Sequence, residues 1–268
     1  MDMTIVSTLL GVLLLAFPLY AFYLSGARLV RQSVMALCRM LVQVSLTGCL
    51  VWALDVVNHW SLGVAALLLL SLFAAWMTAR RGRLRRTKML LPLWLCLFVA
   101  SLATALYLET VVLRVEHPFD GRWLLAVGGA MLAAATSVLE VSLREYFVGL
   151  VRFSSTYYYK VGNGARWYQA VMPIVRRAVE RSYRPSLARV SMLGLFVMPF
   201  LMSGLLMGGV DVLQAAAATI AIVAGGAFCS MLAFVLVVFV SHRFVIDKRG
   251  SLKDCVRLKP GKNTNNKE

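Results

Sequence analysis

The chain has 268 residues, of which 60% are hydrophobic and 15% are charged, and 28 lysines and arginines against 12 acidic residues give it a formal net charge of +16. This apolar content exceeds that of an ordinary soluble domain and predicts an all-α, polytopic membrane protein. The positive charge does not indicate a nucleic-acid partner, because the basic residues stand between hydrophobic runs rather than on one face of a soluble fold. Five cysteines without Cys-x-x-Cys spacing imply neither a disulfide framework nor a metal framework.

The first apolar run, residues 3–27, is predicted to be a membrane span. No basic region precedes it and Arg28 and Arg31 follow it, an order that favours a span over a cleaved signal peptide. A helix needs about 20 apolar residues to cross a bilayer. Further intervals without Asp, Glu, Lys or Arg predict spans at 56–79, 89–108, 123–139, 190–210 and 212–242.

A seventh span is predicted at 33–54, although Arg39 and Gln43 interrupt it. The interval 212–242 is longer than one bilayer crossing, and we interpret it as one long helix because its "VAGGAF" stretch is a weak place for a hairpin. The expected architecture is therefore a transmembrane helix bundle of about seven spans.

The basic residues predict the orientation of these spans, because Lys and Arg in short loops stay cytoplasmic. With the N-terminus outside, the outer loops hold only Arg114 and Arg122. The C-terminus is then cytoplasmic. We expect a transmembrane domain over 1–245 and, over 246–268, a basic disordered cytoplasmic tail that contacts anionic lipid.

Few polar residues fall inside the predicted spans. Arg39 and Gln43 are four residues apart and share one helix face. They line a transport pathway, or Arg39 extends to the lipid headgroups while Gln43 bonds a neighbouring helix. Glu109 and Glu140 stand near the ends of their spans and are expected at the membrane interface, with a cation path as the alternative for Glu140.

No group of residues indicates catalysis. The three histidines, His59, His117 and His242, form no ligand pair, and no GxxxxGK[ST] phosphate-binding loop is present. The chain is therefore not expected to be an enzyme or to bind ATP or another cofactor directly, and metal ligands stay unknown.

The longest predicted non-spanning stretch is the segment at about 147–190. Within it, apolar residues recur at helical spacing, with arginines on the other faces, at Val171, Ile174, Val175, Ala178 and Val179. We predict an amphipathic basic helix that begins at Pro173 and ends at Pro185. It lies on the anionic inner leaflet, or it docks onto a partner whose cleft receives the small Gly164-Ala165 turn.

Three separated sets of residues keep, in the same order, the spacing of a known family. They are Arg39, Gln43 and Gly48 followed by 74–76; Gly164, Ala165, Gln169, Ala170, Arg176 and Pro185; and Gly194, Pro199, Met202, Ser203, Gly204 and 209–211. On these sets the chain resembles the FetB-like family of ABC-transporter permeases, which includes bacterial iron-export permeases and plant relatives linked to aluminium tolerance. It departs from the family at 133–136, where Ala-Ala-Ala-Thr replaces a Gly-Asn-Ala-Met run, and at Phe200, which replaces a glycine.

The resemblance implies a permease of the inner cell membrane that exports iron or another metal ion. It implies that residues 164–185 dock onto a separate cytoplasmic ATP-binding subunit, which binds the ATP, and that two permease chains pair with two such subunits. The residues then expected to couple the chain to the ATPase are Gly164, Ala165, Gln169, Ala170 and Arg176. The weaker candidates for the transport pathway are Arg39, Gln43, Pro199 and Ser203.

Two other classes stay open. A membrane-embedded enzyme acting on lipid-linked substrates would use the basic loops to bind phosphate headgroups, but it needs clustered Asp, Glu or His at a membrane face. A membrane assembly subunit would scaffold other proteins. Co-purification of an ATPase distinguishes a permease from both.

Overall fold

Every element that the structure describes is a helix, as the composition predicts. The computed structural model describes residue 20 and residues 30–57, 60–82, 86–113, 120–196 and 198–245. Its elements are α3 (Val30–Val57), α4 (Trp60–Arg81), α5 (Arg86–Tyr107), the π-helix η1 (Leu108–Val112), α6 (Gly121–Arg152), α7 (Ser154–Gly162), α8 (Trp167–Phe196), α9 (Met198–Met207) and α10 (Val212–Val245). The predicted tail 246–268 and, apart from residue 20, the predicted first span lie outside these ranges.

Within the described ranges, five helices are long and apolar enough to cross a membrane, by length and composition: Ser33–Leu54, Ser61–Arg81, Met89–Val112, Trp123–Arg152 and Val212–Ser241. They coincide with the spans predicted at 33–54, 56–79, 89–108, 123–139 and 212–242. The single helix α10 confirms that the last interval contains no hairpin. Long apolar helices are thus confirmed at these five intervals, because hydropathy summed over about 20 residues depends little on tertiary context.

The chain divides into two units, Met1–Val57 and Asn58–Glu268. In the first, α3 exposes apolar side chains along most of its length, among them Val42, Leu46 and Trp52. Such a helix surface suits contact with lipid or with other apolar helices.

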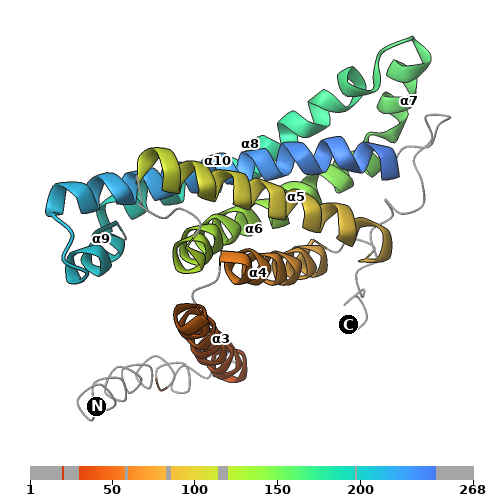
Figure 1. The fold of residues 1–268 in the computed structure, drawn as a ribbon. Coiled ribbons are helices and arrows are strands. Elements are labelled where there is room, and N and C mark those ends of the chain that lie inside the picture. Colours follow the sequence, from red (N-terminus) through yellow and green to blue (C-terminus); the bar gives the residue numbers. More distant parts are fainter. Residues whose placement is uncertain are drawn as a thin grey trace. The chain divides into compact units, whose positions relative to one another are not determined.

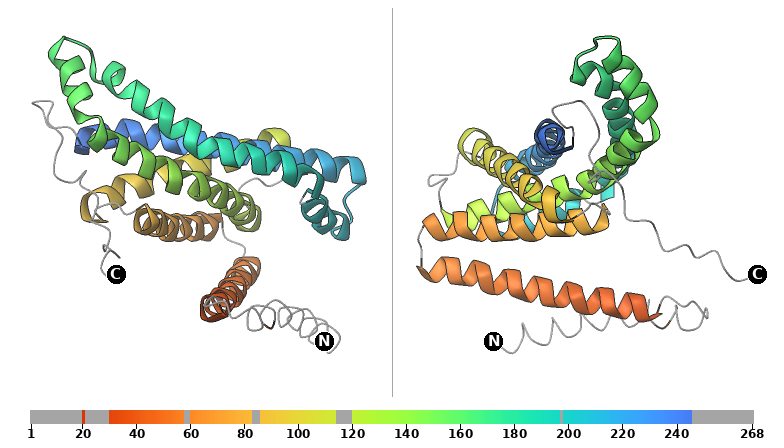
Figure 2. Two further views of the ribbon diagram at one scale, coloured as in Figure 1. Left: turned by 180° about the vertical axis from the view of Figure 1, so that it is seen from behind. Right: turned by 90° about the vertical axis from the view of Figure 1, so that its right-hand side faces the viewer.

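In the second unit the long helices alternate in direction. Gly63 approaches Gly121 and Arg81 pairs with Glu140, so α4 and α6 run parallel. Figure 1 and Figure 2 show α5, α6 and α10 side by side, with α8 along them. The buried core is formed by these helices, α4 and α7.

The helices α6 and α10 are longer than one bilayer crossing. They have 32 and 34 residues. At about 1.5 Å per residue they extend about 48 and about 51 Å, against about 30 Å of hydrocarbon core. Both helices are therefore longer than the hydrocarbon core is thick, and α7 follows directly at the end of α6.

The bounds predicted for the amphipathic helix were wrong. The helix α8 begins at Trp167 rather than Pro173 and continues through Pro173 and Pro185 to Phe196. Each proline removes one backbone hydrogen bond, but burial of Ile174 and Ala178 in the core supplies tertiary packing that keeps the helix formed. The interval predicted as a span at 190–210 is divided between the end of α8 and the short helix α9.

Candidate functional site

The turn between α7 and α8 is defined by one glycine in the left-handed region. Gly164 has φ +81°. Its N–H donates to the Val161 carbonyl and the N–H of Ala165 donates to the Lys160 carbonyl, both at 3.0 Å. This is the hydrogen-bond pattern that ends many helices with a glycine. Gly164 is exposed, and a Cβ built there would meet no atom within 4 Å. The structure therefore has a hydrogen-bonded, exposed tip at the predicted Gly-Ala turn.

The first turn of α8 is capped by its own side chain. Gln169 Oε1 accepts a hydrogen bond from the backbone N–H of Arg166 at 3.0 Å. A Gln three residues into a helix that reaches back in this way satisfies one of the free N–H groups at the helix start. Next to it, Ala170 is only 4% exposed and belongs to the core. Gln169 and Ala170 thus fix where α8 starts and which face it buries.

The structure brings four of the five predicted coupling residues together. Gly164, Ala165, Gln169 and Ala170 lie within the turn and the first turn of α8. Arg176 lies farther along α8, where its Nε donates to Glu180 Oε1 at 3.0 Å and its side chain is 80% exposed. An exposed ion pair of this kind contributes little to stability, so Arg176 stays accessible to a partner.

We name α7, the turn 163–166 and α8 the α7–α8 hairpin. Figure 1 shows its turn projecting at one end of the second unit, and Figure 2 shows α8 returning along α6. Arg181 donates to Glu145 Oε2 on α6 at 2.6 Å. The Arg177 guanidinium lies 4.5 Å from the ring centre of Phe153. These contacts join the returning helix to the part of α6 that leads into α7.

Close packing reinforces this attachment. A Cβ at Gly149 would lie 2.6 Å from Cγ2 of Ile174, so α6 and α8 approach each other there only because Gly149 has no side chain. In α7, Tyr157 is 2% exposed; burial, and more weakly the neighbouring Tyr158, raise the pKa of its hydroxyl. Below its exposed turn, the hairpin is therefore packed onto the bundle.

The substitution Gly149→Leu should separate α8 from α6. Overpacking costs about 1–3 kcal/mol, so we expect hydrogen exchange of the α8 backbone over 167–182 to accelerate about tenfold. Gly129→Leu on the same helix is the matched control, because a Cβ there meets no atom within 4 Å. Equal exchange in both variants would show that contacts other than the Gly149–Ile174 approach hold α8.

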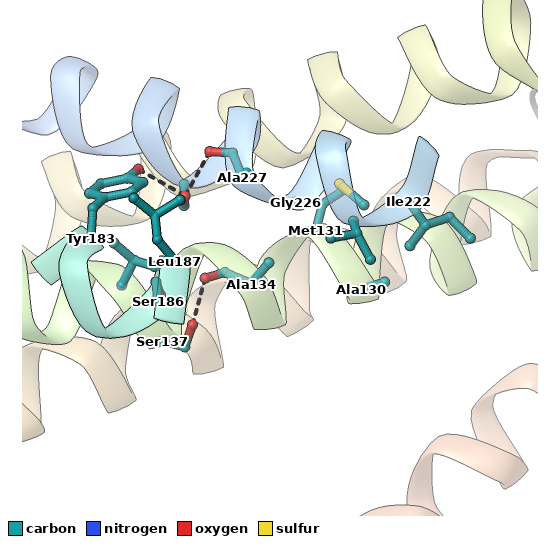
Figure 3. Close-up of a pocket in the computed structure, with 13 residues that line it drawn as sticks. Ala130, Met131, Ala134, Ser137, Tyr183, Ser186, Leu187, Ile222, Gly226 and Ala227 are labelled. Carbon is teal, nitrogen blue, oxygen red and sulfur yellow. Dashed lines mark hydrogen bonds between the residues drawn. The ribbon is translucent and has the colours of Figure 1, made fainter. Parts of the chain in front are cut away.

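A pocket of about 310 Å³ lies where α6, α8 and α10 meet. Figure 3 shows Tyr183 of α8 reaching toward α10, with Ala130, Met131 and Ala134 of α6 along the pocket. The hydroxyls of Tyr183 and Ser230 are hydrogen-bonded at 2.8 Å. The pocket is lined mainly by apolar and small side chains, with hydroxyl groups from Ser137, Tyr183, Ser186 and Ser230.

The predicted pathway residues lie elsewhere. Pro199 and Ser203 stand on α9, are exposed, and are not among the residues that line the pocket. Arg39 and Gln43 are exposed on α3, in the other unit. Sequence reasoning missed Tyr183 and Ser230. The available signal was the pair of small-residue runs at 133–136 on α6 and 224–227 on α10, because small residues let α8 approach both helices.

The two carboxylates of the predicted spans differ. Glu140, within α6, pairs with Arg81, the last residue of α4, at 3.1 Å, and the Glu140 side chain is 21% exposed. Glu109 is fully buried in η1, and its expected position at the membrane interface stays a prediction. In the part of the chain that the structure describes, no three His, Cys, Asp or Glu side chains are grouped to hold a metal ion.

Residues 5–246 match a family described as Uncharacterised protein family (UPF0014). The chain belongs to this family. It is a family of ABC-transporter permease-like proteins, and with its apolar helices the chain is a permease-like, multi-pass membrane protein. No curated protein and no solved structure matches the chain.

The UPF0014 match covers most of both units, including the α7–α8 hairpin and the pocket between α6, α8 and α10. These features therefore belong to the part of the chain that matches the family.

Proposed function

We propose that the chain is the membrane-spanning permease subunit of an ABC transporter, and that a separate ATP-binding subunit docks at the turn of the α7–α8 hairpin. The observation that carries this proposal is the hydrogen-bonded, exposed tip at Gly164, projecting on a helix pair whose other end packs within the bundle. A small protruding turn fits a cleft on a partner better than it fits a flat lipid surface.

The same helix leads from the tip to the pocket. From Gln169 at its start, α8 passes Arg181, which pairs with α6, and reaches Tyr183, which bonds Ser230 of α10. A movement of the tip driven by ATP binding on the partner would shift α8 against both helices. Alternating access requires such a packed interface with two arrangements, and the pocket at this interface is where we place the cargo.

The predicted orientation agrees with this scheme. With the N-terminus outside, the turn at Gly164 is cytoplasmic, where ATP-binding subunits stand. Two permease chains would pair with two ATP-binding subunits in the inner cell membrane. Gly164, Ala165, Gln169 and Ala170 would form or position the docking tip, with Arg176 beside it.

The proposed cargo is iron or another metal ion, moved outward, and its support is the family resemblance. The pocket offers hydroxyl oxygens but no carboxylate among its lining residues. Since Fe and similar ions prefer carboxylate, imidazole or thiolate ligands, the cargo would be held only weakly in this arrangement. Weak holding suits transport, which needs release.

The proposal is tested by isolating the tagged chain from its native membrane in mild detergent. An ATP-binding subunit carrying a GxxxxGK[ST] motif should co-purify in equal amounts. In reconstituted vesicles, the rate of ATP hydrolysis by this subunit should rise more when a metal ion is added than when small organic solutes are added. Absence of the ATP-binding subunit, with or without prior cross-linking, would overturn the permease proposal. If no metal ion stimulates ATP hydrolysis, the choice of cargo is overturned, whereas the permease proposal is not.

A further inference from the structure

A buried carboxyl group without a hydrogen-bond partner lies in the second unit. Glu109 is 0% exposed, and neither of its carboxyl oxygens has a hydrogen-bond partner among the residues that the structure describes. It stands in Met89–Val112, one of the helices that are long and apolar enough to cross a membrane. A buried ionised carboxylate without a partner is among the costliest groups a protein can contain, and in lipid no water relieves it.

The backbone around Glu109 is unusual as well. Its carboxyl is carried by η1, a single stretch of π-helix that continues α5. Short π-helical stretches interrupt regular helices at a cost and occur frequently at functional sites. A regular helix would turn residue 109 and those after it to a different face. The π-helix is thus a second feature, independent of burial, that singles out this position.

The surroundings supply no described charge to neutralise the group. The elements in contact with η1 are α5, α6 and α10. The approach of Leu108 to Gly225 shows which part of α10 faces η1. No titratable residue occurs in α10 over 212–228 or in α6 over 123–139. On α5 the nearest titratable residues are Tyr107, which is exposed, and Cys96, more than three turns away.

Charged residues at the ends of these elements do not change the conclusion that no described charge neutralises Glu109. Asp120 and Asp211, which precede α6 and α10, are acidic and so cannot neutralise an ionised Glu109. Arg114, His117 and Arg122 have side chains outside the described residues. An ion pair with one of them is the competing arrangement, and it would keep Glu109 ionised.

We propose that Glu109 is a proton-binding site: its carboxyl carries a proton at neutral pH while η1 is packed against α10, and releases the proton when this interface opens to water. The neutral acid removes most of the cost of burial, and opening restores hydration to the ionised form. The ligand is the proton itself, and the packing of η1 on α10 determines whether it is bound.

Infrared difference spectroscopy tests the protonation directly. The spectrum of the wild-type chain minus that of Glu109→Gln, in deuterated buffer at neutral pH, should contain the carbonyl band of a protonated carboxylic acid. Glu140→Gln is the matched control: because Glu140 pairs with Arg81, its difference spectrum should contain carboxylate bands. Carboxylate bands in the Glu109 difference spectrum would overturn the proposal and establish the ion pair instead. If Glu109→Gln does not fold, Glu109→Asp retains the acid and should shift the same band.

Thiol labelling tests the link between proton release and opening. Cys229 is fully buried on α10, one turn beyond Gly225, whereas Cys38 on α3 is exposed. As the pH rises above neutral, alkylation of Cys229 should accelerate more in the wild type than in Glu109→Gln, after normalisation to Cys38. The ratio between the two proteins cancels the ionisation of the thiol itself. We expect this ratio of labelling rates to rise about tenfold per pH unit. An opening that releases one proton becomes about tenfold more favourable with each pH unit. A ratio independent of pH would overturn the proposed coupling.

Discussion

Gly164→Arg is expected to abolish association with the ATP-binding subunit while the helix bundle stays folded. Arginine at φ +81° costs about 1–2 kcal/mol of local backbone strain. That strain lies in an exposed turn, where no described atom stands within 4 Å of the new Cβ. The long side chain at the tip would prevent entry into a cleft that accepts glycine. The measurements are co-purification of the ATP-binding subunit and, in the same sample, helix content by circular dichroism.

Gly209→Arg is a closely matched control. Gly209 has φ +82°, and a Cβ there also meets no atom within 4 Å. Its N–H donates to Leu206 and that of Val210 donates to Leu205, so α9 ends with the same hydrogen-bond pattern as α7. Figure 1 shows the α9–α10 turn at the opposite end of the second unit from the hairpin. The two variants share the same backbone strain and differ in location, so equal loss of the ATP-binding subunit in both would contradict docking at Gly164.

The parts of the fold that sequence predicts well are those set by local composition. The bounds of α4 and α10 follow charge-free intervals, because exclusion of charges from the hydrocarbon acts on every residue of a span. The turn at Gly164 also follows from local chemistry, since glycine adopts positive φ without the strain that a Cβ causes. Neither feature depends on which helices pack together.

Tertiary packing decided the features that sequence reasoning missed. Pro185 would end an isolated helix, but α8 continues past it, and Tyr183, two residues before it, is hydrogen-bonded to Ser230. Tyr183 and Ser230, which both line the pocket, are 47 positions apart in the sequence. No local sequence pattern indicates that they meet. Burial of Glu109 likewise depends on packing against α10, which has no titratable residue over 212–228 and so carries no signal for a carboxyl.

Gly63→Ala is expected to produce the largest loss of stability among the single-methyl additions to the α4–α6 interface. A Cβ at Gly63 would lie 2.4 Å from Cα and 3.2 Å from the carbonyl oxygen of Gly121. Both are backbone atoms, so no rotamer change relieves the overlap and α4 must move away from α6. We expect a loss of about 3 kcal/mol, near the upper end for overpacking. The measurement is equilibrium unfolding of the purified chain in detergent, followed by circular dichroism.

Two adjacent glycines of α6 calibrate this effect. A Cβ at Gly128 would lie 2.7 Å from Cδ1 of Leu67, the flexible end of a side chain that can turn aside, so Gly128→Ala should cost about 1 kcal/mol. A Cβ at Gly129 meets no atom within 4 Å, so Gly129→Ala should be neutral or slightly stabilising, because alanine favours the helix over glycine. The expected order of destabilisation is Gly63, Gly128, Gly129. If Gly63→Ala and Gly129→Ala were equally stable, the backbones of α4 and α6 could not be in contact, and the parallel pairing of these helices would have to be replaced.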